Sequence, residues 1–132
     1  MKKILLLILL SFSAIPAFAS HEYLEKEYQK HWCSINKGSV EVRLQDNTRI
    51  DCLTDEYAIE FDFALKWAES IGQALYYSHC TGKKAGVVLI MENGQKDEKY
   101  LARLNAVAKR YGITVWTMSP ADMPCTKTSC RK

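Results

Sequence analysis

The 132-residue chain lacks several patterns that identify common classes of small protein. It has no Cys-x-x-Cys motif, which argues against a thioredoxin-like redox protein. No pair of cysteine or histidine residues has the spacing of zinc ligands, which argues against a structural zinc site. Internal repeats and low-complexity runs are also missing, so a single globular domain accounts for the chain.

Long apolar runs are confined to the N-terminus. Two lysines precede the apolar run 4–10, and Ala17 and Ala19 provide small residues at cleavage positions. The run is too short to span a bilayer, and no later stretch of the sequence is long enough. This pattern predicts a secretory signal peptide over residues 1–19, with Ser20 as the first mature residue. We therefore expect an exported protein, periplasmic or secreted, with no membrane attachment after signal removal.

The mature chain has almost no net charge. Without Lys2 and Lys3, the 18 lysine and arginine residues fall to 16, against 15 aspartate and glutamate residues, a net charge of +1. A protein that holds a polyanion by charge alone needs a strongly basic surface. Any nucleic-acid partner would therefore require a local basic patch or a bound metal.

All five cysteines follow the predicted signal peptide, and export permits disulfides. Cys125 and Cys130 are the first expected pair, because they close a short loop in the tail. Two of Cys33, Cys52 and Cys80 are candidates for a second bridge, and the spacing does not choose among them. Since five is odd, at least one thiol stays free or pairs between chains.

Hydrophobic periodicity predicts an α/β fold. Helices are expected at residues 22–35, 64–79 and 97–111, and strands at 39–44, 49–54, 57–63, 85–91 and 113–118. A hairpin followed by strands that alternate with helices indicates a mixed sheet covered by helices on both faces. Residues 20–118 would form the domain, and residues 119–132 a cysteine-containing tail.

Acidic side chains mark the second and third predicted strands. Alternation places Asp51 on the opposite face from Ile50 and Cys52, and it places Glu60 and Asp62 together on one face. If the two strands are neighbours, the three carboxylates converge on one side of the sheet. Like charges at that range destabilise one another unless they are protonated or bridged by a cation. Oxygen-only ligands of this kind suit Mg²⁺ or Mn²⁺.

The helix that follows carries a polar stripe. Lys66, Glu69, Gln73 and Tyr77 fall at positions i, i+3, i+7 and i+11, so they share one side of the helix. If this side faces the carboxylates, Lys66 would hold an attacking water or a phosphate. Gln73 and Tyr77 would contact a nucleic-acid backbone or order the metal ligands.

These residues carry a resemblance to a known family. Asp51 followed by Glu60-x-Asp62 resembles the PD-(D/E)XK nuclease superfamily, and Gln73-x-x-x-Tyr77 is similar to the motif of its RecB-like branch. The resemblance covers residues 22–118. It implies a restriction-endonuclease-like αβββαβ core with a mixed sheet flanked by helices. It also implies a Mg²⁺-dependent (or Mn²⁺-dependent) phosphodiesterase acting on DNA, of the restriction-enzyme and Holliday-junction-resolvase kind.

The resemblance also implies roles for single residues. Asp51 and Glu60 would be metal ligands, and an acid on the first helix would correspond to Glu27, with Glu25 as the second choice. The sequence departs from the family at Asp62, which stands where the family usually has lysine. Some members carry a second acid there, and in others the lysine lies on the next helix, where Lys66 is available.

Simpler interpretations remain open beside these. Asp62 would also serve as the N-cap of the second helix. Glu60 would also be explained as a protective charge on an edge strand. Asp51 would also be a solvated partner of Arg49. A further interpretation is that the same fold is catalytically inactive and binds nucleic acid or a protein partner.

Overall fold

The predicted element order αβββαβαβ is confirmed. The computed structural model describes residues 21–124, so the predicted signal peptide and the expected Cys125–Cys130 pair lie outside the described residues. The helices and strands are α1 (Glu25–Ile35), β1 (Ser39–Arg43), β2 (Arg49–Leu53), β3 (Tyr57–Phe63), α2 (Trp67–Thr81), β4 (Lys84–Ile90), α3 (Glu98–Tyr111) and β5 (Thr114–Met118). Short 3₁₀ turns are η1 (Ala64–Lys66), η2 (Gly94–Lys96) and η3 (Pro120–Asp122).

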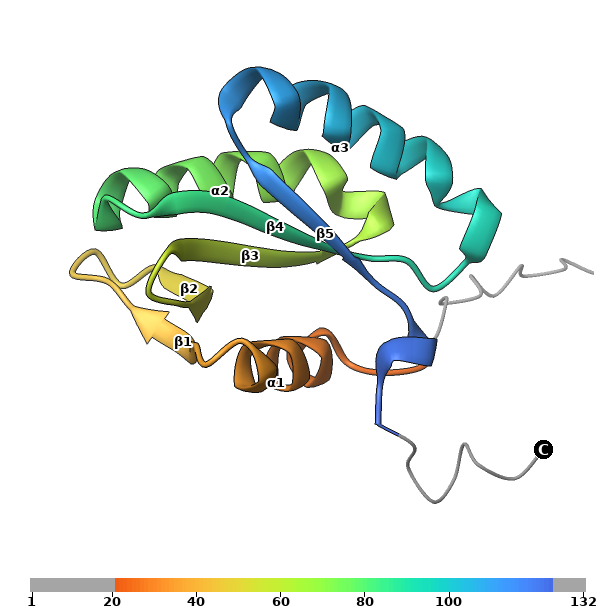
Figure 1. The fold of residues 1–132 in the computed structure, drawn as a ribbon, viewed down its shortest axis with the longest axis horizontal. Coiled ribbons are helices and arrows are strands. Elements are labelled where there is room, and N and C mark those ends of the chain that lie inside the picture. Colours follow the sequence, from red (N-terminus) through yellow and green to blue (C-terminus); the bar gives the residue numbers. More distant parts are fainter. Residues whose placement is uncertain (1–20, 125–132) are drawn as a thin grey trace, which may run out of the picture.

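The five strands form one mixed sheet in the order β1-β2-β3-β4-β5. The first three strands pair antiparallel, because short turns connect them, whereas β3, β4 and β5 pair in parallel and are joined through α2 and α3. Helix α1 covers one face of the sheet, and α2 and α3 cover the other (Figure 1). β3 is therefore the central strand, with a neighbour on each side.

A separate hydrophobic core fills each side of the sheet. Towards α1, Ile59 and Phe61 of β3 pack with Tyr28, and all three are fully buried. Towards α2 and α3, Val87 and Leu89 of β4 pack with residues of both helices. β4 is buried on both faces, as its continuous apolar run predicts. Within residues 21–124, no helix combines the length and the apolar character needed to cross a bilayer.

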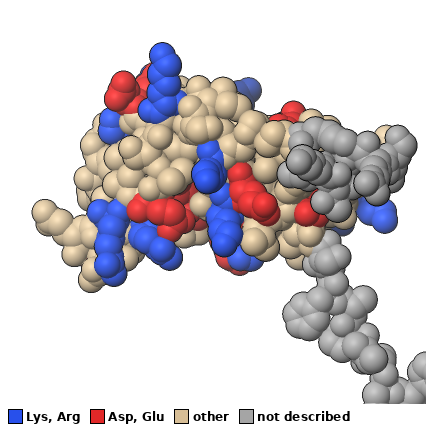
Figure 2. Space-filling model, turned by 90° about the horizontal axis from the view of Figure 1, so that it is seen from below, with Lys and Arg blue, Asp and Glu red and all other residues tan. Residues whose placement is uncertain are grey.

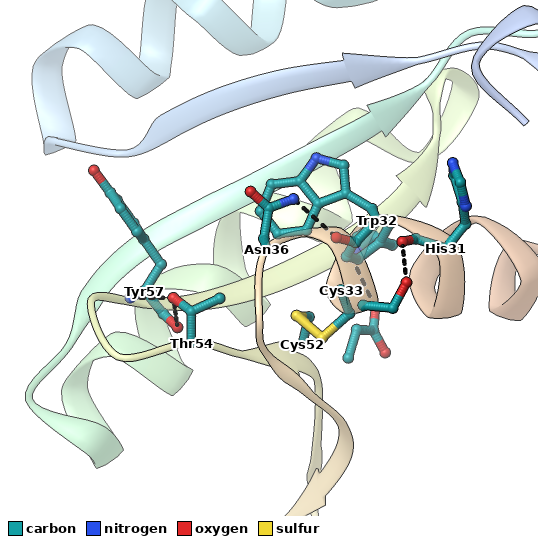
Figure 3. Close-up of a disulfide and its surroundings, with 10 residues drawn as sticks. His31, Trp32, Cys33, Asn36, Cys52, Thr54 and Tyr57 are labelled. Atoms are coloured by element: carbon teal, nitrogen blue, oxygen red, sulfur yellow. Dashed lines mark hydrogen bonds between the residues drawn. A yellow bond between two sulfur atoms is a disulfide. The ribbon is translucent and has the colours of Figure 1, made fainter.

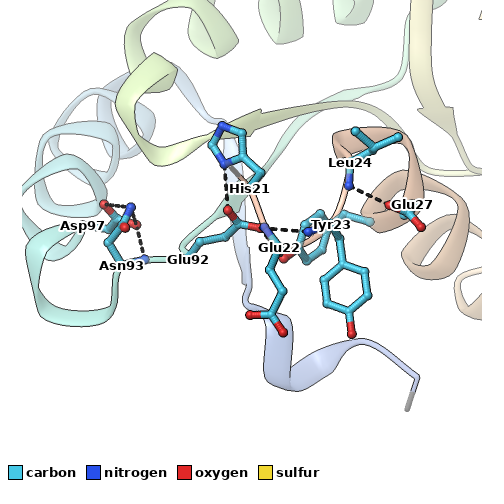
Figure 4. Close-up of polar contacts among 9 residues, drawn as sticks. His21, Glu22, Tyr23, Leu24, Glu27, Glu92, Asn93 and Asp97 are labelled. Atoms are coloured by element: carbon cyan, nitrogen blue, oxygen red, sulfur yellow. Dashed lines mark hydrogen bonds and ion pairs between the residues drawn. The ribbon is translucent and has the colours of Figure 1, made fainter. Parts of the chain in front are cut away.

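The segment before α1 is held by Glu92, which follows β4. The Glu92 carboxylate pairs with His21 at 2.7 Å and accepts the main-chain N–H groups of Glu22 and Tyr23 (Figure 4). It also accepts the Tyr28 hydroxyl at 2.9 Å. These bonds hold residues 21–23 outside the helix. Helix α1 therefore begins three residues later than the predicted start at residue 22.

A disulfide joins Cys33 of α1 to Cys52 of β2 (Figure 3). It is one of the pairings that the sequence left open, and Cys80 is exposed and has no disulfide partner among residues 21–124. The chain passes close to the bridge at Gly38, where a Cβ atom would lie 2.6 Å from both sulfur atoms. Only glycine fits there without a shift of the bridge, so this loop and the disulfide are packed as one unit.

Candidate carboxylate site

Strand β2 loses its regular alternation at Asp51. Alternation predicted that Ile50 and Cys52 share a face, and this is wrong. Ile50 packs with Ala58 and Tyr77 on the α2 side of the sheet, whereas Cys52 is bonded to α1 on the other side. Because Ile50 and Cys52 point to opposite faces of the sheet, the backbone must be twisted at Asp51, which lies between them.

The distortion has a local cause. The β1–β2 pairing is regular on both sides of Glu41 but leaves out Glu41 and Asp51. Glu41 has a φ of 55°, in the left-handed region that side chains other than glycine adopt at a cost. On the other edge of β2, the Asp51 carboxylate accepts the main-chain N–H of Phe61 at 2.8 Å. A side chain thus replaces a main-chain acceptor, and the Asp51 carboxylate lies between β2 and β3.

Two further acids are buried on β3. Glu60 is 6% exposed and Asp62 is 3% exposed, and both alternate with core residues that face α1. One oxygen of each, Glu60 Oε2 and Asp62 Oδ2, is buried and has no hydrogen-bond partner among the described residues. Burying a polar oxygen without a partner costs free energy, so these two atoms are the anomaly of the site.

The simpler interpretations do not account for these acids. Glu60 lies on the central strand rather than on an edge. Asp62 does not cap the following helical turns, since the N-cap of η1 is Phe63 and neither η1 nor α2 has a side-chain cap. Arg49 pairs with Glu41 at 2.7 Å rather than with Asp51.

The carboxyls act strongly on one another. Burial raises the pKa of Glu60 well above its ordinary range, and the charges of Asp51 and Asp62 raise it further. Burial also raises the pKa of Asp51, against the opposing effect of the Phe61 N–H.

Asp62 shows the same behaviour with different neighbours. Burial, followed by the charge of Glu25, raises the pKa of Asp62 to about 7, and the Lys66 ammonium opposes the change. At neutral pH the three β-strand acids therefore do not all carry charge. This is the expected response of like charges confined together without a cation.

The acid that α1 contributes is Glu25. It is half-buried, burial raises its pKa, and Lys66 and His21 offset that effect. Its charge acts on all three β-strand acids. The structure places Glu27, which the resemblance suggested first, elsewhere: Glu27 is exposed and its carboxylate accepts the Leu24 main-chain N–H at 2.6 Å. Glu27 thus caps its own helix in the manner of a capping-box glutamate.

The polar stripe after β3 reaches the acids only in part. Lys66 is exposed in η1, and its charge acts on Asp62 and Glu25. Tyr77 is 5% exposed, and the charges of Glu60 and Asp51 add to burial in raising its pKa. Gln73, one turn earlier on α2, is exposed, and its side chain makes no hydrogen bond with the described residues.

The donor atoms suit a hard divalent cation, but they are not arranged around one. Asp51, Glu60, Asp62 and Glu25 offer carboxylate oxygens only, and two of these oxygens are unpartnered. Among residues 21–124, however, no group of three or more His, Cys, Asp or Glu side chains is already positioned to hold a metal ion. A cation would therefore have to draw the carboxylates together by side-chain rotation.

A hollow of about 760 Å³ lies between α1 and the β1–β2 hairpin, and none of the four acids lines it. It is lined by Lys26, Glu27, Gln29, Lys30, Val40, Glu41 and Arg49. Glu41 connects it to the site, because its charge acts on both Asp51 and Glu25. Basic and acidic groups are interspersed over the α1 face, with no large area of one sign (Figure 2).

No family model, curated protein or solved structure matches the chain. The described residues define an α/β domain with a mixed sheet, whose central strand carries buried carboxyls beside a distorted neighbour.

Proposed function

We propose that the chain is a metal-dependent phosphodiesterase of the PD-(D/E)XK nuclease kind, which cleaves DNA after export. The order and pairing of α1, β1, β2, β3, α2 and β4 agree with the αβββαβ core that the sequence resemblance implies. The acids of the motif lie on the expected strands, Asp51 on β2 and Glu60 with Asp62 on β3.

The observation that carries the proposal is the pair of unpartnered oxygens, Glu60 Oε2 and Asp62 Oδ2. Carboxyls that served only the fold would be expected to have their hydrogen bonds satisfied. Here the acids raise one another's pKa, which destabilises the folded protein at neutral pH. Clusters of this kind are common at functional sites, where a ligand supplies the missing interaction.

Asp51 and Glu60 would hold Mg²⁺ or Mn²⁺, with Glu25 as the contribution of α1. When bound, such an ion activates water and neutralises charge on a phosphate. The protein's own contribution is to fix the donors. The Phe61 N–H orients the Asp51 carboxylate, and the central position of β3 keeps Glu60 away from solvent.

Asp62 and Lys66 would handle the nucleophile. The raised pKa of Asp62 suits a group that accepts a proton from water near neutral pH. Lys66 lies close enough for its charge to act on Asp62, so its ammonium would position either the water or the scissile phosphate. The departure from the family motif at Asp62 thus leaves both a base and a cation next to the metal ligands.

The substrate backbone would enter by the hollow beside α1. Lys26, Lys30 and Arg49 line this hollow and supply positive charge on the α1 side of the sheet. Because the α1 face carries interspersed charges of both signs (Figure 2), binding would depend on these few contacts and on the metal.

A cleavage assay tests the proposal. The purified protein is incubated with Mg²⁺ or Mn²⁺ and with linear, circular, branched or single-stranded DNA. Asp51→Asn and Glu60→Gln should abolish cleavage, whereas Glu98→Gln, on the exposed face of α3, should leave it unchanged. The proposal fails if no substrate is cut, or if Asp51→Asn cuts as well as wild type.

A catalytically silent nuclease-fold module is the second candidate. It is favoured by the lack of a ready-made three-ligand group among residues 21–124 and by the acid in place of the usual lysine. Such a module would bind nucleic acid or a protein partner without turnover. DNA binding with no cleavage under either metal would support it.

A further inference from the structure

An aromatic hollow lies at the opposite end of β3 from the carboxyls. Trp32 of α1, Tyr57 of β3 and Trp116 of β5 line it, and its volume is about 280 Å³. Figure 3 shows Trp32 and Tyr57 on either side of this region, with Asn36 beside Trp32. The hollow is on the α1 face of the sheet, and none of its lining residues belongs to the candidate carboxylate site.

The three aromatic side chains form walls that stand at steep angles. The Trp116 ring lies 5.3 Å from Trp32 at 60° and 5.1 Å from Tyr57 at 84°, measured between ring centres and planes. Trp116 rests on Gly86 of β4, where a Cβ atom would come within 2.8 Å of the indole. Each of the three aromatic residues remains half-buried. Trp116 thus packs against both neighbouring rings, and the aromatic surface that the three side chains leave exposed lines the hollow, which we call the cage.

The rim of the cage is polar and electrically balanced. Glu56 pairs with Lys84 at 2.5 Å, while the Asp55 carboxylate and the Lys37 ammonium have no side-chain partner among the described residues. The Asn36 amide donates its N–H to a main-chain carbonyl of α1, so its oxygen stays available. The rim thus offers donors and acceptors in about equal measure and no net charge.

We infer that this cage is a carbohydrate-binding site that takes one neutral pyranose ring. A non-planar ring with C–H groups on its faces contacts steeply inclined walls together, whereas a flat nucleobase stacks on one wall at a time. Because the rim carries no net charge, it favours neither a phosphate nor a cation over a neutral ligand. A cation is further disfavoured because the Lys84 ammonium already lies 5.7 Å from the centre of the Tyr57 ring.

The polar groups of the rim complete the fit. Ligand sites typically combine apolar and aromatic walls with a few polar groups that fix orientation. Sugar hydroxyls both donate and accept, so they match the Asp55 carboxylate, the Lys37 ammonium and the Asn36 oxygen. The inference is independent of the proposed phosphodiesterase activity, since it involves neither the carboxyls nor a metal.

Binding is tested with the purified protein in the absence of divalent metal. Methyl glucoside, methyl mannoside, methyl galactoside and N-acetylglucosamine are titrated while tryptophan emission and heat are recorded, because Trp32 and Trp116 line the cage. Thymidine and tetramethylammonium serve as the flat and the cationic comparison ligands. At least one pyranoside should bind saturably and more tightly than both of these.

Two variants locate the site. Asp55→Asn removes an exposed charge without a described side-chain partner and should weaken sugar binding about tenfold, the loss expected for one charge-assisted hydrogen bond. Trp116→Phe should weaken it as well, and Glu98→Gln, on α3, should leave it unchanged. The inference is overturned if no pyranoside binds, if thymidine or tetramethylammonium binds in preference, or if Asp55→Asn binds the sugar as wild type does.

Discussion

The Asp51 carboxylate accepts a 2.8 Å hydrogen bond from the main-chain N–H of Phe61, ten residues later on the neighbouring strand. This bond replaces part of the regular ladder, because β2 and β3 pair only at Cys52–Ile59 and Leu53–Ala58. The two strands separate beyond these pairs, and the acids occupy the place where they part. One side chain thus both closes a gap in the sheet and forms part of the candidate site.

Replacing Asp51 tests this double role. Asparagine keeps an oxygen for the Phe61 N–H, whereas alanine leaves that group without its acceptor. We expect Asp51→Ala to be less stable than Asp51→Asn by about 1–3 kcal/mol in urea unfolding. Both variants should lose metal binding and cleavage. Equal stability of the two variants would show that the hydrogen bond contributes little to the fold.

The metal-free protein should lose stability as the pH rises. The folded-state pKa values of Asp51, Glu60 and Asp62 lie above the ordinary values of 3.8 and 4.5, so the folded protein retains protons that the unfolded chain releases. Their stabilising contribution is fully present below those ordinary values. It declines as the pH rises from those values to about 7, where Asp62 titrates in the folded protein, and it declines further until Glu60 also loses its proton.

Thermal unfolding in EDTA measures this effect. The Tm should be higher at about pH 5.5 than at about pH 8 by several degrees, a shift that corresponds to about 1 kcal/mol in a domain of this size. Glu98→Gln should show the same dependence as wild type. A Tm that rises over this range would contradict the assigned directions of the pKa shifts.

Neutralising Glu60 should stabilise the protein while it disables the site. Glu60→Gln removes the most strongly raised carboxyl and keeps a side chain of similar shape. In EDTA at about pH 8 its Tm should exceed that of wild type, and the decline with pH should be shallower. Adding Mn²⁺ should raise the Tm of wild type, because an ion that binds only the folded state stabilises it, and should leave the variant unchanged. A variant less stable than wild type at this pH would count against buried charge repulsion.

The sequence was sufficient for the order of the helices and strands and for the faces of the β3 side chains, because both depend on local periodicity. Alternation along β3 correctly places Glu60 and Asp62 together, and the continuous apolar run correctly predicts the buried β4. Alternation fails at Asp51, because the left-handed backbone of Glu41 and the bond to Phe61 come from neighbouring strands. Contacts of this kind leave no trace in the periodicity of β2.

The acid of α1 shows the same limit. Helical periodicity does not fix where a helix begins, and here the start is set by Glu92, about 70 residues away. Once the helix begins at Glu25, Glu27 falls at the third position and caps the N-terminus. A glutamate three residues after a helix boundary is a known capping signal. This signal explains Glu27 as a cap, and so leaves Glu25 as the acid of α1, only when the helix boundary is known.

Removing the disulfide should destabilise the protein without abolishing the fold. The bridge between Cys33 and Cys52 spans 19 residues, and a cross-link of this length contributes about 3 kcal/mol. The double variant Cys33→Ala/Cys52→Ala should lose about this amount in urea unfolding, and wild type with reductant should behave similarly. Cys80→Ser is the matched control, since that thiol is exposed and unpaired among the described residues.

Because the bridge ties α1 to the strand that carries Asp51, metal binding should weaken more than the stability loss alone explains. Unchanged metal affinity in the folded double variant would show that the packing of α1 holds Glu25 and Asp51 in place without the bridge.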